Sequence, residues 1–266
     1  NSHDAYKIAD GFRKAGSVVV MGGLHPSYFP DEALQHCDSV VIGEAESIWE
    51  QVIKDYENKS LKRTYEGTPL DDYFSSSYGY FLKMNPKILY KTGLLLSRGC
   101  KYRCVFCAPP LGKLRFIKLE QALKIIRRIK DSVKQPFGLK PVIHFRDDNI
   151  FSDPAYAKKL FRELASLGLN WTANSSVDIA FDAEALRWAK ASGCKKLFIG
   201  FETIYPEKLQ KTSVASMRST EDYRKAIKAI RQGEGRVEHA LVIFHYGIFP
   251  QSVATLAELG VTLHGL

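Results

Sequence analysis

The stretch SRGCKYRCVFC, residues 97–107, holds three of the five cysteines of this chain: Cys100, Cys104 and Cys107. Their CxxxCxxC spacing can place three thiolates around one iron–sulfur cluster. A cubane cluster needs a ligand on each iron, so three cysteines leave one iron open for substrate chemistry. Structural and catalytic zinc sites differ in the same way, because a catalytic site keeps one position free. The stretch therefore predicts a catalytic [4Fe–4S] centre.

A zinc site or three unrelated thiols are the alternatives. The other two cysteines, Cys37 and Cys194, each stand alone beside apolar residues, and neither forms the second CxxC half of a four-cysteine zinc site. We expect both to be buried as small hydrophobic side chains. An odd number of cysteines in a chain of 266 residues also argues against a disulfide framework.

From residue 91 onward, strand-like apolar runs alternate with helical periodicity. GLLLS, residues 93–97, is the predicted strand before the cysteines. The predicted strands are 92–98, 141–147, 170–174, 195–201, 238–244 and 260–264. The predicted helices are 118–133, 154–167, 182–192, 220–233 and 251–259. Core positions at helical spacing are Ala122, Ile125, Ile126 and Ile129, then Tyr156, Leu160, Leu164 and Leu167. This order predicts a partial (β/α) barrel of six strands, with its chemistry at the carboxyl ends of the strands.

The N-terminal part also alternates strands and helices. VVVMGG, residues 18–23, and SVVIG, residues 39–43, are apolar strands that end in glycine, and a helical pattern follows each. This order predicts a parallel sheet flanked by helices. Residues 67–90 have no clean period and are predicted to be a linker. The chain begins at Asn1 within a helical pattern, so we expect it to be a fragment.

On these residues the chain resembles the cobalamin-binding radical SAM (S-adenosylmethionine) proteins. Residues 91–203 resemble the radical SAM core, and residues 16–66 resemble the second half of a cobalamin-binding domain. The fold class implied is α/β: a partial Rossmann-like cobalamin-binding domain (1–66), a linker (67–90) and a partial (β/α)6 TIM-like radical SAM barrel (91–266).

The resemblance implies a [4Fe–4S] cluster with Cys100, Cys104 and Cys107 as ligands. SAM would chelate the open iron, and one electron would cleave it to methionine and a 5′-deoxyadenosyl radical. The implied reaction is cobalamin-dependent methyl transfer to an unactivated carbon of a small molecule, with cyclisation or rearrangement as alternatives. An electron donor such as flavodoxin or ferredoxin is implied as partner.

The resemblance also implies residues that contact SAM. Phe106, the aromatic residue before the last cysteine, would face the adenine. Asp147 and Asp148 match the FxDD variant of this region, so they would contact the SAM amino group or hold the substrate, although helix capping or a turn would explain them equally well. The polar residues at the third strand end are Asn174, Ser175, Ser176 and Asp178, of which Asn174 and Ser176 are the SAM candidates. Glu202, in IGFET, matches a G-x-E position that contacts SAM.

The cobalamin contacts implied are Gly22, Gly23, His25, Gly43 and Glu44, in two loops that would line the nucleotide tail of the cofactor. His25 is expected to form a structural hydrogen bond rather than to bind cobalt. The first strands of the family's cobalamin domain have no counterpart here, so the predicted cobalamin site is partial.

Composition narrows the class of protein further. The chain is 45% hydrophobic and carries a net charge of +9, but its basic residues are scattered, so no nucleic-acid partner is predicted. It has no apolar run long enough for a membrane helix and no signal peptide pattern. We expect a soluble, cytoplasmic protein, where thiolate ligands stay reduced.

The tail allows two interpretations. Residues from about Gly233 onward can supply the fifth strand, a helix and the sixth strand of the barrel. They also resemble the C-terminal part of some orotate phosphoribosyltransferases, which would make the chain a chimera. An inactive truncated or chimeric fragment and a plain metal-binding module are therefore the alternatives to an enzyme.

Overall fold

The chain folds into two compact units. The computed structural model describes residues 2–70, 93–104, 107, 113–133, 140–200, 219–232 and 239–243. One unit comprises residues 1–80 with 110–112, and the other comprises residues 81–109 with 113–266. Most of the predicted linker, residues 67–90, lies outside the described residues, and the domain bounds at 66 and 91 stay a prediction.

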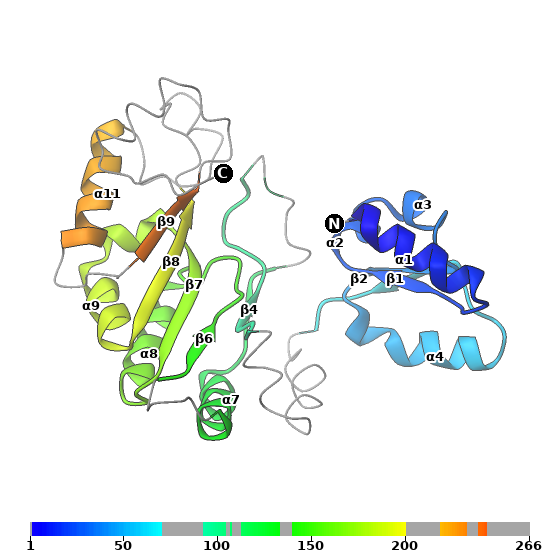
Figure 1. The fold of residues 1–266 in the computed structure, drawn as a ribbon, viewed down its shortest axis with the longest axis horizontal. Helices are drawn as coiled ribbons and strands as arrows, with labels where there is room; N and C mark the ends of the chain where they lie inside the picture. Colours follow the sequence, from blue (N-terminus) through cyan, green and yellow to red (C-terminus); the bar gives the residue numbers. More distant parts are fainter. Residues whose placement is uncertain are drawn as a thin grey trace. The chain divides into compact units, whose positions relative to one another are not determined.

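The N-terminal unit contains a parallel sheet with the strand order β1-β2-β3 (Figure 1). Its strands are β1 (Val20–Gly22), β2 (Ser39–Gly43) and β3 (Thr64–Gly67). Its helices are α1 (Ser2–Lys14), α2 (Leu24–Tyr28), α3 (Pro30–Ala33), the 3-10 helix η1 (Ala45–Ser47) and α4 (Trp49–Glu57). Each strand ends in a glycine, so all three carboxyl ends lie at one edge of the sheet.

Alternation of side chains along β2 gives this sheet two apolar faces. Val40 packs on one face with Tyr6 of α1, Ala33 of α3 and Cys37. Val41 packs on the opposite face with Val52 of α4 and Tyr65 of β3. Helices therefore cover both faces, as the alternating sequence pattern predicts, and Cys37 is fully buried as expected.

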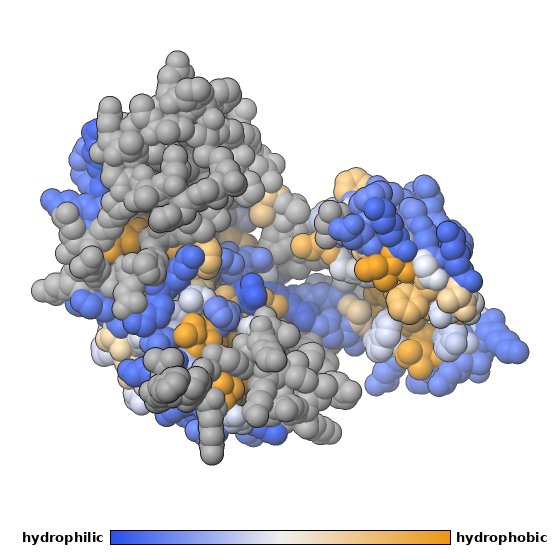
Figure 2. Space-filling view, in the orientation of Figure 1, coloured by the Kyte–Doolittle hydropathy of each residue, from blue (hydrophilic) through white to orange (hydrophobic). Residues whose placement is uncertain are grey.

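Some large hydrophobic side chains of the N-terminal unit remain exposed. Figure 2 shows hydrophobic surface on this unit between α1 and α4. The exposed large hydrophobic residues of these two helices are Ile8, Phe12, Trp49, Ile53 and Tyr56. Among the described helices, none is both long enough and apolar enough to cross a bilayer.

The C-terminal unit is built on a second parallel sheet, with the order β6-β7-β8-β9. The strands are β6 (Val142–His144), β7 (Asn170–Ser176), β8 (Cys194–Gly200) and β9 (His239–Ile243). The helices between them are α8 (Pro154–Ala165), η3 (Val177–Phe181), α9 (Ala183–Ala191) and α11 (Thr220–Gln232), and α7 (Leu119–Ser132) precedes β6. These elements agree with the predicted ones to within a few residues. The predicted helix 251–259 and strand 260–264 lie outside the described residues.

The core of this unit lies between the sheet and its helices. Trp171 of β7 is fully buried, stacks on Phe161 of α8 and meets the ring of Phe145 edge-on. The predicted core residues are confirmed as buried, as is Cys194, with one exception. Tyr156 is only partly buried, and its hydroxyl group donates to the backbone oxygen of Ile117 at 3.0 Å.

The predicted first barrel strand, 92–98, needs a correction. Leu94 forms a parallel bridge with Phe145, so this position does lie beside β6. Ser97–Arg98 instead form strand β4, which pairs antiparallel with β5, Arg115–Phe116. The chain leaves the parallel sheet after Leu94 because the backbone NH of Ile117 bonds to Leu96 and continues this second ladder. A short hairpin therefore closes the base of the segment that carries the cysteines.

Candidate functional site

The three cysteines lie on the cysteine loop, residues 99–114, between β4 and β5. Gly99 opens it with φ 88°, a conformation that favours glycine, and a Cβ atom there would lie 3.1 Å from the Cα of Leu114. The backbone NH of Cys107 bonds to the carbonyl of Cys104 at 3.1 Å, which makes a turn between these two. The pairing of β4 with β5 thus fixes the two ends of the loop that carries the cysteines.

None of the three cysteines forms a disulfide. Cys100 and Cys104 are partly buried and Cys107 is exposed. In the part of the chain that the structure describes, no three His, Cys, Asp or Glu side chains converge on one point as ligands of a single ion do. The thiolates of a cubane bind separate irons, so they need not converge in this way. Three cysteines outside any disulfide, carried by one loop, fit the chemistry of such a cluster.

Asp147 is buried beneath this loop. Its Oδ1 accepts a hydrogen bond of 2.5 Å from the Ser97 hydroxyl, and its Oδ2 accepts one of 3.2 Å from the backbone NH of Leu96. Burial raises the pKa of Asp147 to about 6, although both hydrogen bonds act in the opposite direction. Its carboxylate oxygens therefore hold the strand that leads to the cysteines.

The neighbouring Asp148 is exposed and lies on the side of Cys100. Partial desolvation raises the pKa of the Asp148 carboxyl group. Burial raises the pKa of the Cys100 thiol, and the charge of Asp148 acts in the same direction. The Ser152 hydroxyl, 3.8 Å from the Cys100 sulfur, acts in the opposite direction, as do Asn149 and Lys101. Three side chains of the segment 147–152, those of Asp148, Asn149 and Ser152, thus influence the thiol of Cys100.

Asn149 joins this segment to the end of β7. Its Oδ1 accepts hydrogen bonds of 3.0 Å from the backbone NH groups of Phe151 and Ser176. Its Nδ2 donates to the Ser176 hydroxyl at 3.2 Å. The Ser176 hydroxyl lies 3.3 Å from Asp178, which forms an ion pair of 3.4 Å with Lys101 of the cysteine loop. Asn149 and Lys101 therefore connect the ends of β6 and β7 with the cysteines.

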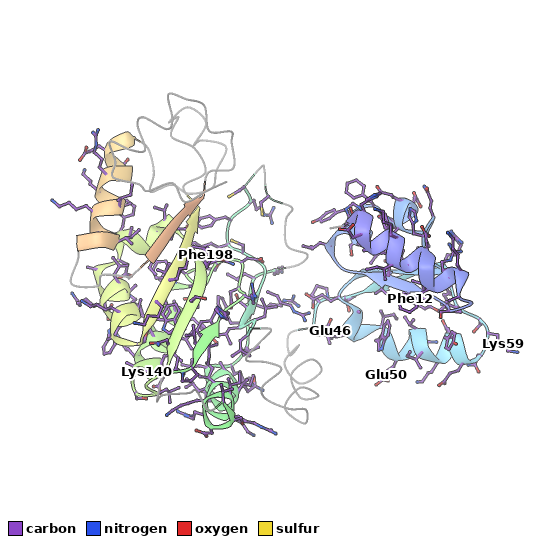
Figure 3. The ribbon with its side chains drawn as sticks, viewed as in Figure 1. Phe12, Glu46, Glu50, Lys59, Lys140 and Phe198 are labelled. Atoms are coloured by element: carbon purple, nitrogen blue, oxygen red, sulfur yellow. The ribbon has the colours of Figure 1, made fainter. Side chains whose placement is uncertain are left out.

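The predicted residues of β7 lie on one face of the sheet. Trp171, Ala173 and Ser175 are buried on the face toward α8, so Asn174 and Ser176 lie on the opposite face. Asn174 pairs in register with Phe198 of β8, which is labelled in Figure 3. The amide of Asn174 also donates to the backbone oxygen of Asp147 at 3.2 Å. The structure thus brings Asp147, Asn174 and Ser176 together at one sheet edge.

The predicted cobalamin residues lie at the carboxyl edge of the N-terminal sheet. Gly23 and Gly43 both have positive φ angles, 99° and 84°. Ser27 links the two loops, because its hydroxyl donates to the Gly23 carbonyl at 2.7 Å and accepts from the Gly43 NH at 3.0 Å. A Cβ atom on Gly43 would lie 2.4 Å from the backbone oxygen of Gly67, so the two strand ends touch.

His25 forms the structural contact that the sequence predicts. Its Nε2 lies 3.2 Å from Oε1 of Glu32, and its ring packs against Phe29 at a centroid distance of 5.1 Å. Glu44 precedes η1, and its backbone oxygen accepts a hydrogen bond of 3.2 Å from Ser47. The structure therefore assigns His25 a partner within its own unit.

Two predicted SAM contacts, Phe106 and Glu202, lie outside the described residues. Three residues that support the candidate sites were not predicted from the sequence: Ser27 in the N-terminal unit, and Asn149 and Ser152 near Cys100. The sequence gives only a weak signal for two of them: Asn149 directly follows Asp147 and Asp148, and Ser27 lies four residues after Gly23. Nothing in the sequence indicated that Ser152 would lie beside a cysteine 52 positions away.

The sequence of the C-terminal unit matches the model of a known protein family. The Radical SAM superfamily model matches residues 94–260, which is more than half of the chain and includes the cysteine loop.

The chain belongs to the radical SAM superfamily.

The match of this radical SAM protein runs to residue 260 and so includes most of the tail from about Gly233. The comparisons give no support for a foreign tail or for the resemblance to orotate phosphoribosyltransferases.

Two curated relatives come from Chlorobaculum tepidum. This chain is 31% identical over 262 residues to bacteriochlorophyllide d C-12(1)-methyltransferase, and the match covers 94% of this chain and 54% of the relative. It is 28% identical over 249 residues to bacteriochlorophyllide d C-8(2)-methyltransferase, covering 86% of this chain and 53% of the relative. The chain spans about half the length of these relatives.

Solved structures share the fold. The radical S-adenosylmethionine methyltransferase TsrM from Kitasatospora setae, with cobalamin and a [4Fe–4S] cluster bound, matches with a TM-score of 0.71 at 16% identity, over 98% of this chain and 57% of that one. The cobalamin-dependent S-adenosylmethionine radical enzyme OxsB matches with a TM-score of 0.70 at 18% identity, over 97% of this chain and 41% of that one. Both halves of the predicted fold class are thereby confirmed.

Proposed function

We propose that this protein is a cobalamin-dependent radical SAM methyltransferase that methylates an unactivated carbon of a small molecule. The observation that carries the proposal is the cysteine loop, which the hairpin β4–β5 holds beside the polar ends of β6 and β7. Parallel strands that end at a common edge are where barrel enzymes gather their chemistry. Both relatives from Chlorobaculum tepidum are methyltransferases by name, which favours methyl transfer over cyclisation or rearrangement.

Cys100, Cys104 and Cys107 would hold the cluster, with SAM at the open iron. The bound cluster and SAM supply a 5′-deoxyadenosyl radical, and cobalamin supplies the methyl group. Asp148, Asn174 and Ser176 would contact the polar groups of SAM, since they lie around the same sheet edge as Cys100. We assign Asp147 a positioning role instead, because both of its oxygens accept hydrogen bonds from residues 96 and 97.

The glycine loops of the N-terminal unit would contact cobalamin. Gly22, Gly23 and Gly43 bring backbone without side chains to the carboxyl edge of the sheet, which is where ligands of open parallel sheets bind. Ser27 fixes the two loops relative to each other. Glu44 directly follows Gly43 and stays a proposed contact. We give His25 no role at the cobalt, since Glu32 already pairs with its ring nitrogen.

Bacteriochlorophyllide d is the first substrate to assay, because it is named for both relatives. A low-potential carrier such as flavodoxin or ferredoxin would deliver the electron, and dithionite would replace it in the assay. We place the reaction in the cytoplasm, where thiolate ligands stay reduced.

The test is anaerobic. The protein is reconstituted with iron and sulfide, given dithionite, SAM and hydroxocobalamin, and 5′-deoxyadenosine is quantified by mass spectrometry with and without bacteriochlorophyllide d. Replacement of Cys104 by Ala removes a proposed ligand, so we expect at least about a hundredfold less 5′-deoxyadenosine than for the wild type.

Cys194→Ala is the matched control. Cys194 is buried in β8, on a strand that does not carry the cysteine loop, so its loss should leave the yield within about twofold. Equal losses in both variants would contradict the ligand assignment. A wild-type protein that binds a cluster but forms no 5′-deoxyadenosine would contradict the proposed activity.

A further inference from the structure

Ser152 is a buried hydroxyl group aimed at a proposed cluster ligand. Its Oγ donates to the Cys100 sulfur at 3.8 Å, a distance typical of the longer hydrogen bonds that sulfur accepts. Ser152 is 5% exposed, so water cannot easily replace this donor. The fold thus brings the Ser152 hydroxyl, 52 positions away in the sequence, against the sulfur of Cys100.

The hydroxyl group is held in place from both sides. On one side, the Ser152 NH bonds to the Asn149 carbonyl at 3.0 Å, and Asn149, itself 4% exposed, is fixed to the end of β7 through Ser176. On the other side, Asp153 caps helix α8 by accepting hydrogen bonds from the NH groups of Ala155 and Tyr156 at 2.8 and 3.0 Å. Ser152 therefore lies between a fastened turn and a capped helix and has little freedom to turn away from Cys100.

We propose that Ser152, positioned by Asn149, raises the reduction potential of the cluster held by Cys100. This inference rests on the proposed function, because it requires the cluster. One electron passes from the reductant to the cluster, and no bond is made or broken. The reduced cluster carries one more negative charge on its irons and sulfurs, so a hydrogen bond to a ligand sulfur stabilises the reduced form more than the oxidised form.

The other charged groups near Cys100 give this hydrogen bond its context. Asp148 places a negative charge near the same sulfur, and Lys101 places a positive one there. Lys101 is paired with Asp178, so part of its charge is already neutralised. Ser152 and the amide of Asn149 are then the neutral donors on the Cys100 side of the site, within the described residues.

The test is a redox titration of the reconstituted protein, followed by the electron paramagnetic resonance signal of the reduced cluster. We expect the midpoint potential of Ser152→Ala to be more negative than that of the wild type. Ser152→Thr keeps the hydroxyl group and should restore a potential close to the wild type. Ser166→Ala is the control, because Ser166 is exposed at the far end of α8 and should leave the potential unchanged.

A second pair of variants separates the hydrogen bond from packing. Ser152→Val has the shape of Ser152→Thr but no donor, so its potential should fall below that of the Thr variant at equal iron content. Equal potentials in the Thr and Val variants, or in the wild type and Ser152→Ala, would overturn the proposal. So would loss of the cluster in both the Ala and Val variants while Thr retains it, since Ser152 would then serve assembly. Failure of the wild type to bind a cluster would instead contradict the proposed function.

Discussion

Asp147 illustrates how one buried carboxyl group sets the local order of the site. It lies in the interior, where a charged carboxylate loses its hydration, and the hydrogen bonds from the Ser97 hydroxyl and from nearby backbone NH groups compensate for only part of that loss. The result is a pKa raised to about 6, against an ordinary value of 3.8. Ionisation of Asp147 inside the folded protein therefore lowers the stability of the fold.

The direction of the pH effect follows from this shift. Between pH 4 and 6 the folded protein holds the Asp147 proton more tightly than the unfolded chain does, so the contribution of this residue to stability falls as the pH rises. Well below the unfolded pKa this loss is absent, and it is complete about one pH unit above the folded pKa of about 6. A shift of about two pKa units corresponds to roughly 3 kcal/mol.

We therefore predict a pH-dependent difference between the wild type and Asp147→Asn. The free energy of unfolding of the wild type, minus that of the variant, should decrease by roughly 2.5 kcal/mol from pH 4 to pH 7, because the amide does not titrate. Urea unfolding of the apo protein under reducing conditions at several pH values measures this difference. Ser97→Ala should move the transition to higher pH, since it removes a donor to the ionised form. A difference that stays constant with pH would rule out the raised pKa.

At the scale of elements, the ends of neighbouring strands decide what can approach the N-terminal sheet. β2 and β3 end at Gly43 and Gly67, and neither position has room for a side chain. A Cβ atom on Gly43 would clash with the backbone oxygen of Gly67, and one on Gly67 would clash with the backbone oxygen of Glu44. Gly43 also has a φ of 84°, which an L-residue with a side chain rarely adopts. Gly11 differs from Gly43 in both its space and its backbone conformation. It is exposed within helix α1, and a Cβ atom there would meet nothing within 4 Å.

Alanine at these two glycines should therefore have opposite effects. Gly43→Ala should destabilise the N-terminal unit by at least about 2 kcal/mol, from the strained φ and the clash with the Gly67 carbonyl. Gly11→Ala should stabilise it by roughly 0.5–1 kcal/mol, since alanine is the better helix former. Native-state hydrogen exchange of the β2 amides measures the opening free energy of this unit alone. Shifts of the same sign in both variants would contradict the predicted crowding at Gly43.

The elements themselves could be predicted because each carries a local pattern. The apolar spacing of Ile125, Ile126 and Ile129 gave α7 and its buried side, and glycines gave the ends of β1 and β2, whereas β3 was not predicted. The hairpin β4–β5 could not be predicted, since strands of two residues have no period. It forms because residues 96–98 find partners across the loop that holds the cysteines.

The site was predicted less completely, since it depends on which way side chains turn. Alternation along the strand places Ile143, Phe145 and Asp147 on one face, and this face is the buried one. The sequence could not show that Asp147 lies on this buried face, and its predicted contact with SAM stays a prediction. The contact of Ser152 with Cys100 depends on the register of β6 and on the course of two loops, and neither is encoded within a short window.

At the scale of the whole molecule, the cofactors proposed are assigned to different units. The glycine loops belong to the N-terminal unit, and the cysteine loop belongs to the C-terminal unit apart from residues 110–112. Each unit has its own parallel sheet and its own buried residues. A ligand that binds to the folded form of one unit stabilises that unit by mass action, so each cofactor should leave a separate trace in hydrogen exchange.

We predict that hydroxocobalamin slows amide exchange in the peptides that contain Gly22–Leu24 and Gly43–Ala45. In the reconstituted protein, SAM should slow it around residues 100–104 and 147–152. Hydrogen exchange with mass spectrometry, with each ligand added alone and then both together, gives the measurement. At a ligand concentration about a hundred times the Kd, opening of the protected segments should become roughly a hundred times less frequent.

Ser27→Ala tests whether the cobalamin effect arises at the proposed loops. The hydroxyl of Ser27 holds the Gly23 and Gly43 loops together, so its removal should weaken the protection by hydroxocobalamin and leave the protection by SAM unchanged. Loss of both effects would point to unfolding of the variant rather than to a local change at the loops. Protection by hydroxocobalamin that is absent from both glycine loops in the wild type would refute the assignment of Gly22, Gly23 and Gly43, while protection by SAM would still support the assignment of the cysteine loop.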